Sequence, residues 1–324
     1  MYNITSIGIA SISLIVLNYQ FEIPKVLAFL IICIFTVFSL ISNIKKINFS
    51  KRDYYYLLWL STLLISGLLS MDPTTSILGG GYRHQGLIFF VGLYLLTKYV
   101  EILTVKQRTN LYKYVGVVVL IESILVIFGF KLGTIGEINA VAGFMAIGIY
   151  FVKELFPKLF LIFPIGAMLI NFSKSGFLAL IPYIFKKVNL FLILLIVFSV
   201  FIIKPVNNNS DYESRGVIWK YAISVIQDKP ILGHGAESNE VLYDKKFLED
   251  NTILTNLRID RAHNLFLDIT IWSGLIGLYF FVMFTYESFK NLNFEKKQVF
   301  LSFLIYSMFQ PLSVVHWILL ALVV

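Results

Sequence analysis

A histidine stands where a polar segment meets a long apolar one, in the stretch RAHNLFLDITIWSGLIG (residues 261–277). An imidazole exchanges a proton near neutral pH, and a positioned histidine base is typically worth about 10²–10⁴-fold in rate. His263 follows Arg258 and Arg261, and Arg215 precedes an amphipathic stretch further upstream. Arginine binds phosphate oxygens in a bidentate manner, so this combination indicates a site for an anionic group beside a proton acceptor. The alternative for His263 is a residue at a helix start without chemistry.

Two further basic residues are candidates for binding the same anionic group. Arg83 is the sole basic residue of GGGYRHQG (79–86), where three glycines allow the backbone to approach a ligand closely; a plain turn explains the motif equally well. Lys174 lies in NFSKSG (171–176), in a tight turn between two apolar segments. Its alternative role is to extend toward the lipid headgroups.

Amides and carboxylates near apolar segments are candidates for supporting roles. Asn264 and Asp268 are one helical turn apart on the same face, and we expect them to form a polar network beside His263. A carboxylate deep in lipid costs about 2.5–3.5 kcal/mol, so Asp268 should face protein or water. Glu122 raises the same question without an evident partner. Asn139 is predicted to be a helix N-cap, with a ligand contact as the alternative.

The chain that carries these residues has the composition of a membrane protein. Of its 324 residues, 58% are hydrophobic and 14% are charged, against about 25% charged in soluble domains. Apolar segments close to the roughly 20 residues that cross a bilayer follow one another almost without pause. The sequence therefore predicts an all-α, polytopic integral membrane protein with about 11–12 transmembrane helices. The apolar segments are 4–21, 24–43, 54–71, 86–104, 112–130, 139–156, 158–172, 175–186, 188–204, 263–288, 297–310 and 311–324.

Lysine and arginine alternate between loops in a way that predicts the orientation. If the N-terminus is cytoplasmic, each inner loop holds several basic residues and each short outer loop holds one. The chain then divides into a transmembrane bundle (1–204), an extracytoplasmic loop (205–262) and C-terminal transmembrane helices (263–324). Apolar spacing within the loop predicts an amphipathic helix on the outer bilayer surface, interrupted by Pro230, and a partly irregular segment at 240–262.

Several classes of function are disfavoured. The net charge of +8 does not indicate nucleic acid, because the basic residues lie in short loops between apolar segments. Cys33 is the single cysteine, which excludes an intramolecular disulfide and a cysteine-based metal site. The sequence has no phosphate-binding glycine loop with a lysine, no HExxH and no aspartate-rich cluster, which argues against an ATP-driven pump and a metal-dependent transferase. We expect no cofactor.

The motif around the histidine resembles that of a known family. His263-Asn264, nine residues, then Gly274-Leu-Ile-Gly277 resembles the H-N-x9-G-x-x-G signature of the O-antigen ligase and O-antigen polymerase family. Residues 214–235 are similar to the preceding part of that family's signature, in which an arginine precedes an amphipathic helix with a tryptophan, then acidic-x-Pro and Leu-Gly-x-Gly. In this sequence these residues are Arg215, Trp219, Asp228, Pro230, Leu232, Gly233 and Gly235. The resemblance covers about 205–288.

The resemblance implies a metal-independent glycosyltransferase on the outer face of the cytoplasmic membrane. Its donor would be a polyprenyl-diphosphate-linked glycan among membrane lipids, and its acceptor a hydroxyl of a glycan, a lipid or a protein. His263 would be the general base and Arg215 would bind the diphosphate, with Arg83 and Lys174 as weaker matches to the family. Arg261 has no counterpart in the family's signature, and we add it to the diphosphate ligands because of its charge and its proximity to His263. Lys174 occupies a place where the family often has arginine, so it keeps the charge but loses the bidentate fork.

Two questions remain open from the sequence. Ligation of a finished chain, polymerisation of repeat units and transfer to a protein hydroxyl use the same chemistry with different acceptors. A transporter or flippase of lipid-linked oligosaccharides would instead need ionisable groups along a path through the membrane, where Glu122 alone lies at mid-depth.

Overall fold

The computed structural model describes residues 2–16, 21–184, 215–249 and 259–324, and these residues form helices and turns without a strand. Short 3₁₀ turns lie at Ile12–Leu14, Ile44–Lys46 and Lys158–Leu161. The α-helices are α1 (Tyr2–Ser11), α2 (Glu22–Ser42), α3 (Lys51–Leu68), α4 (Pro73–Leu78), α5 (Leu87–Ile102), α6 (Val105–Ile127), α7 (Ile138–Leu155), α8 (Ile162–Asn171), α9 (Lys174–Ala179), α10 (Ile181–Ile184), α12 (Arg215–Asp228), α13 (Asn239–Glu249), α14 (Leu265–Asn291), α15 (Phe294–Ser307) and α16 (Val314–Val323).

The helices confirm an all-α, multi-pass membrane protein. In the described part of the chain, α2, α6, α7 and α14 are each long and apolar enough to cross a membrane, and shorter apolar helices accompany them. Leu27, Ile31, Ile34 and Phe38 on one side of α2 are each more than half exposed, as expected for a face in contact with lipid. Within the described residues, every predicted apolar segment overlaps helix, while 188–204 and parts of 4–21 and 175–186 lie outside the described residues. The total of 11–12 spans stays a prediction.

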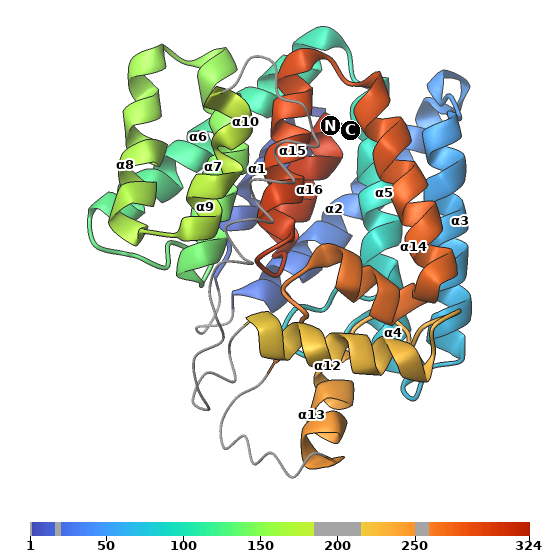
Figure 1. Ribbon diagram of the computed structural model, residues 1–324. Helices are drawn as coiled ribbons and strands as arrows, with labels where there is room; N and C mark the ends of the chain where they lie inside the picture. The colour runs from blue at the N-terminus through green and yellow to red at the C-terminus, as the bar shows by residue number, and fades with distance from the viewer. Residues whose placement is uncertain (1, 17–20, 185–214, 250–258) are drawn as a thin grey trace.

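Aromatic side chains at the centre of the bundle join four helices. Phe90 of α5 is fully buried, and its ring centroid lies 5.0 Å from that of Trp59 on α3. The same ring lies 5.4 Å from Trp317 of α16 and 5.8 Å from Trp272 of α14. Tilted and edge-on ring pairs of this kind add stabilisation beyond their buried area. The pairs hold α5 against α3, α14 and α16 (Figure 1).

Helix α14 is broken at Gly274, and the loop after α12 uses the backbone groups that the break frees. Gly274 has φ 64° and ψ −170°, a conformation that L-residues rarely adopt. The Leu275 amide donates to the Pro230 carbonyl at 2.8 Å, and the His234 amide donates to the Ile271 carbonyl at 2.7 Å. A Cβ atom at position 274 would lie 2.1 Å from a backbone carbonyl oxygen of this loop. The first glycine of the H-N-x9-G-x-x-G motif therefore permits this insertion.

The second glycine of the motif allows close packing between α14 and α3. A Cβ atom at Gly277 would lie 2.1 Å from the Ser273 hydroxyl and 3.0 Å from the Thr62 hydroxyl on α3. Ser66 of α3 also donates to the Trp272 carbonyl at 2.6 Å. Both glycines therefore allow the backbone conformation and packing of α14, the helix that follows His263.

The amphipathic helix exists, but its apolar face packs on protein. In α12, Ile218, Tyr221 and Val225 are buried, and the helix packs against α14 and α13 across one end of the bundle (Figure 1). The Tyr221 and Phe247 rings lie 4.5 Å apart, centroid to centroid. The expectation that this face lies on the bilayer surface is therefore wrong. The segment 240–262, expected to be partly irregular, begins with α13 and ends at 259–262 without regular secondary structure, while 250–258 lie outside the described residues.

Glu122, for which the sequence offered no partner, stabilises the loop between α6 and α7. Its carboxylate accepts hydrogen bonds from the Thr134 amide, at 3.0 Å, and from the Thr134 hydroxyl. Lys25 of α2 donates to the Thr134 carbonyl at 2.7 Å and to the Phe21 carbonyl at 2.7 Å. These bonds give Glu122 a structural role at the end of α6.

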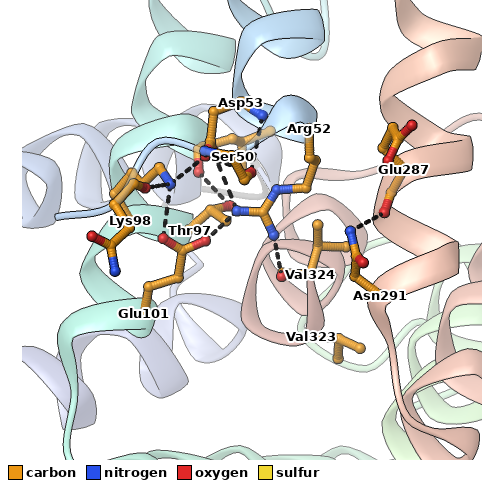
Figure 2. A network of polar contacts seen from close by, with 12 residues as sticks. Ser50, Arg52, Asp53, Thr97, Lys98, Glu101, Glu287, Asn291, Val323 and Val324 are labelled. Atoms are coloured by element: carbon orange, nitrogen blue, oxygen red, sulfur yellow. Dashed lines mark hydrogen bonds and ion pairs between the residues drawn. The ribbon is translucent and has the colours of Figure 1, made fainter.

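A network of charged side chains lies at the C-terminal end of α5 (Figure 2), whereas the segment that contains Arg83 precedes the N-terminal end of this helix. Lys98 donates to Asp53 at 2.7 Å and to Glu101 at 2.8 Å. Arg52 pairs with Glu101, lies 3.3 Å from an Asp53 oxygen and donates to the Val324 carbonyl at 2.5 Å. Buried charges are tolerated when they are paired and hydrogen-bonded in this manner.

Candidate active site

A cavity of about 700 Å³ collects polar side chains from six parts of the chain. They come from the segment before α5, the start of α7, the start of α12, the start of α13, the segment before α14 and the segment before α16. The lining residues are Gly81, Tyr82, Arg83, Glu137, Asn139, Arg215, Ile218, Glu240, Ile259, Asp260, His263, Gln310 and Pro311. Three residues predicted from the sequence, Arg83, Arg215 and His263, therefore lie at one cavity.

The backbone holds His263 from both sides. The Ala262 amide donates to Asp268 at 2.8 Å, and the Ala262 carbonyl accepts from the Trp219 indole at 3.0 Å. Asn264 is the N-cap of α14, accepting from two first-turn amides at 3.0 and 3.2 Å. Between these anchors His263 has φ 54°, a left-handed conformation that costs a non-glycine residue about 1–2 kcal/mol. Strain of this kind is concentrated at functional sites.

Asn264 and Asp268 thus lie next to the histidine, as expected, but they act on its backbone. The Asp268 carboxylate also accepts from the Asn239 amide at 2.8 Å, and Asn239 accepts from the Trp272 indole at 2.5 Å. Asn239 is the first residue of α13, so this chain of bonds joins α13, α14 and the segment that carries His263. No pattern in the sequence indicates a role for Asn239.

His263 is a neutral imidazole at physiological pH. Burial, followed by the charge of Arg215, lowers its pKa from 6.5 to about 3, against an opposing influence from Asp260. Its Nδ1 atom is buried without a hydrogen-bond partner in the described part of the chain. A neutral ring with an unpartnered nitrogen, beside a cavity, is able to accept a proton.

Arg83 enters the cavity as part of an ion pair. It is 4% exposed, and its Nε atom donates to Asp260 at 2.5 Å. A second guanidinium nitrogen lies 3.9 Å from the Glu137 carboxylate. Burial lowers the pKa of Arg83, and the nearby charge of Asp260 raises it. The influence of the acidic neighbours is the larger, so the pKa of Arg83 is raised and the side chain stays cationic. Burial raises the pKa of the Asp260 carboxyl, but the charges of Arg83 and Arg261 lower it by more. The pKa of Asp260 is therefore below its usual value.

Arg215 is the first described residue of α12 and lines the cavity. Its Nε atom donates to the Phe309 carbonyl at 3.3 Å, which ties the start of α12 to the end of α15. Its charge is felt at His263, whose pKa it lowers. The structure therefore brings this arginine to the histidine, as the sequence predicts. Arg258 lies outside the described residues.

Arg261 is turned away from the cavity. It is 3% exposed, pairs with Glu237 and lies 4.8 Å from the ring centroid of Trp272. One of its nitrogens donates to the Asp260 carbonyl at 3.0 Å. The side chain does not line the cavity, so the geometry favours a role in positioning the segment before His263 over direct binding of a diphosphate.

Lys174 and Asn139 also differ from expectation. Lys174 is exposed at the first position of α9 and does not line the cavity. Asn139 is not an N-cap, because α7 begins one residue earlier and Glu137 precedes it. Instead, Asn139 lines the cavity and accepts from the Ser173 hydroxyl at 2.8 Å. The turn that contains Lys174 is thus connected to the cavity through Ser173.

Several lining residues were not predicted. These residues come from segments that are distant in the chain, and no local pattern distinguishes them from ordinary loop residues. They are Tyr82, Glu137, Glu240, Asp260 and Gln310.

A comparison with protein families decides the relationship of the chain. The sequence model of the O-antigen ligase family matches residues 117–282, just over half of the chain. The chain belongs to the O-antigen ligase family. The match confirms the resemblance seen at 205–288 up to residue 282, and extends it upstream to α6 and α7. No curated protein and no solved structure matches the chain significantly.

The family match and the cavity coincide in large part. Residues 117–282 include Glu137, Arg215, Asp260 and His263, whereas Arg83 lies upstream of the match. As a member of the O-antigen ligase family, the chain is a multi-pass membrane protein with a ligase-like or polymerase-like role in polysaccharide biosynthesis.

Proposed function

We propose that the protein transfers a glycan from a polyprenyl-diphosphate carrier to an acceptor hydroxyl, on the outer face of the cytoplasmic membrane. The observation that supports this proposal is the meeting of a neutral histidine and two arginines at one cavity. The family relationship supports glycan transfer in general. A site at the end of the bundle suits a donor whose lipid tail lies among the helices and whose diphosphate lies at headgroup depth.

In the proposed reaction, His263 accepts the proton of the acceptor hydroxyl as its oxygen attacks the anomeric carbon. The bond between that carbon and the diphosphate oxygen breaks, and the diphosphate leaves with the electron pair. Arg215 and Arg83 stabilise the negative charge of the leaving group. A single displacement inverts the anomeric configuration, so the new glycosidic bond should have the opposite configuration to the donor.

Donor binding would also activate the base. In the protein without donor, burial and arginine charges keep the pKa of His263 at about 3, which makes the imidazole a weak base. A diphosphate beside the arginines compensates their charge, and a nearby anion raises the pKa of an imidazole. The histidine thereby becomes a stronger base when the donor is present. We propose that the arginines supply the charge stabilisation without a metal ion, so transfer should persist in excess EDTA.

The proposal covers ligation and polymerisation, with transfer to a protein hydroxyl as a third form of the same chemistry. It is favoured over transport of lipid-linked oligosaccharides, because Glu122, the candidate for a path through the membrane, is bound to Thr134 in a loop. The length of the glycan that accumulates on lipid distinguishes the forms. Long chains indicate ligation, and single repeat units indicate polymerisation.

Mass spectrometry of lipid-linked and transferred glycans tests the proposal in cells that carry His263→Gln at wild-type membrane levels. We expect the variant to accumulate lipid-linked glycan on the outer face and to lose the transferred product. The matched control is His84→Gln, since His84 also has a left-handed backbone (φ 52°) but does not line the cavity. Identical glycan profiles for wild type and His263→Gln would refute the assignment of the base.

A further inference from the structure

Among the described residues that line the cavity, acidic side chains outnumber basic ones, which a diphosphate site alone does not explain. The acidic and basic lining residues are Arg83, Arg215, Glu137, Asp260 and Glu240. His263 adds no charge, because its pKa is about 3. Each carboxylate repels a bound diphosphate, so the acidic residues suit a second group at the cavity that is uncharged or cationic. Asp260 pairs with Arg83 at 2.5 Å, and Glu240 also has interactions within the protein.

The other two carboxylates flank the segment that contains Arg83. The Glu137 carboxylate is 3.9 Å from the nearest Arg83 nitrogen, beyond hydrogen-bond distance, and its side chain is 38% exposed. A Cβ atom added at Gly81 would lie 3.5 Å from the Glu240 carboxylate, so this group lies beside the same segment. Neither carboxylate is needed to neutralise Arg83, which Asp260 already does.

An aromatic ring and a buried amide accompany these carboxylates. Tyr82 lines the cavity and is 47% exposed, so one part of its ring is accessible. Gln310 is 8% exposed, and its Oε1 atom has no hydrogen-bond partner among the described residues. Buried polar atoms without partners are rare in folded proteins and indicate a missing ligand or water. Carboxylates and amides bind hydroxyl groups, and an aromatic face packs against the apolar face of a sugar ring.

We propose that Tyr82, Glu137, Glu240 and Gln310 bind the acceptor sugar and select a neutral or amino sugar against an acidic one. The assignment to the acceptor rests on the proposed function, because the base that takes the acceptor proton lines the same cavity. The hydroxyls of a neutral sugar bond to the carboxylates and the amide, and an ammonium group gains attraction. A uronic acid brings a third carboxylate to the two already there and is repelled.

Binding of three matched sugars to the full-length protein in lipid nanodiscs tests this selectivity. The probes are methyl β-glucoside, methyl β-glucuronide and methyl β-glucosaminide, measured by calorimetry at pH 8 with saturating inorganic diphosphate to occupy the arginines. We expect the glucoside to bind at least about tenfold more tightly than the glucuronide, with the glucosaminide at least equal to the glucoside. Equal or tighter binding of the glucuronide, no saturable binding of any probe, or loss of glucoside binding when diphosphate is added would overturn the proposal.

Substitutions identify the residues responsible. Glu137→Gln and Glu240→Gln should each reduce the preference for glucoside over glucuronide by at least about threefold, because one repulsive charge is removed while an amide still bonds to hydroxyls. Asp244→Asn is the matched control, since Asp244 is exposed on α13 one turn from Glu240 and does not line the cavity. An unchanged preference in both glutamate variants contradicts the proposal.

The sugar site and the proposed catalytic function can be tested separately. Loss of selectivity in the glutamate variants together with normal glycan transfer to a neutral acceptor supports the subsite. If His263→Gln left glycan profiles unchanged in cells while the sugars still bound with the expected order, the sugar site would stand and the assignment of the catalytic base would fail.

Discussion

Two sets of paired charges lie at opposite ends of α5, and they differ in what surrounds them. At one end, Arg52, Asp53, Lys98 and Glu101 bond to one another and to backbone carbonyls, and none of them lines the cavity. At the other end, Arg83 pairs with Asp260 beside a cavity of about 700 Å³. Only the second set adjoins a histidine with an unpartnered nitrogen and a left-handed backbone.

The difference separates the candidate active site from a structural network of charges. Ion pairing alone does not, because both ends have it, and structural ion pairs also perturb pKa values. A cavity, a buried histidine and strained backbone occur together at the end of α5 near Arg83. We therefore expect substitutions at the two ends to separate activity from stability.

The largest effect, a loss of folded protein, is expected at the break in α14, the helix that follows His263. Gly274→Val places a side chain where a Cβ atom would lie 2.1 Å from the Ile231 carbonyl oxygen, in a left-handed conformation that valine does not tolerate. Folded protein should fall below detection by size-exclusion chromatography in detergent. Gly166→Val is the control, since no atom lies within 4 Å of a Cβ there, and it should leave the yield unchanged. Normal yield of Gly274→Val would disprove the need for the break.

The next effect compares the two ends directly. Arg83→Met should lower the rate of glycan transfer per folded protein by about 10²–10³-fold, as removal of a group that stabilises transition-state charge typically does. Arg52→Met removes a guanidinium from the closed network and should lower Tm while transfer per folded protein stays within about twofold. Rates and thermal unfolding of both variants in the same detergent check the pair. Equal losses of transfer would mean that the cavity has no special role.

His263 should contribute to the pH dependence of the protein's stability. The pKa of His263 is about 3 in the folded protein and near 6.5 when unfolded, so on acidification the unfolded chain binds a proton first. This residue therefore contributes stability that is full above pH 6.5 and falls progressively toward pH 3. His263→Gln should flatten that part of the Tm profile, measured between pH 4 and pH 8. A variant profile parallel to wild type would mean that the pKa of His263 is not depressed.

The smallest effect is expected at the exposed lysine. Lys174 is solvent-exposed and outside the cavity, so Lys174→Ala should change transfer by no more than about twofold. Initial rates at limiting donor concentration would reveal a contribution to donor binding. A tenfold rise in KM for the donor would return Lys174 to the set of diphosphate ligands and would place the turn before α9 in the site.

The sequence predicted the helices well because apolar length and loop charge are local properties of the chain. It also identified His263, Arg215 and the two glycines at 274 and 277, since these form a motif with fixed spacing. It did not reveal that Arg261 faces Glu237 rather than the cavity, because the direction of a side chain depends on its tertiary partners.

The acidic part of the cavity could not be predicted for a related reason. Glu137 and Glu240 are separated by more than 100 positions and follow no shared pattern, and only the packing of α7 and α13 brings them to one cavity. Likewise, the periodicity of α12 showed an apolar face but not whether protein or lipid covers it. These features arise from contacts between distant segments.

The central claim is that glycan transfer takes place at the cavity near Arg83, with His263 as the base. Its most direct test is single-turnover transfer from lipid-linked donor, extracted from the producing cells, to acceptor by purified protein in liposomes. For His263→Gln we predict unchanged donor binding and a transfer rate at least about 100-fold lower than wild type, as expected for loss of a general base. A rate within fivefold of wild type, with equal donor occupancy, would contradict the claim.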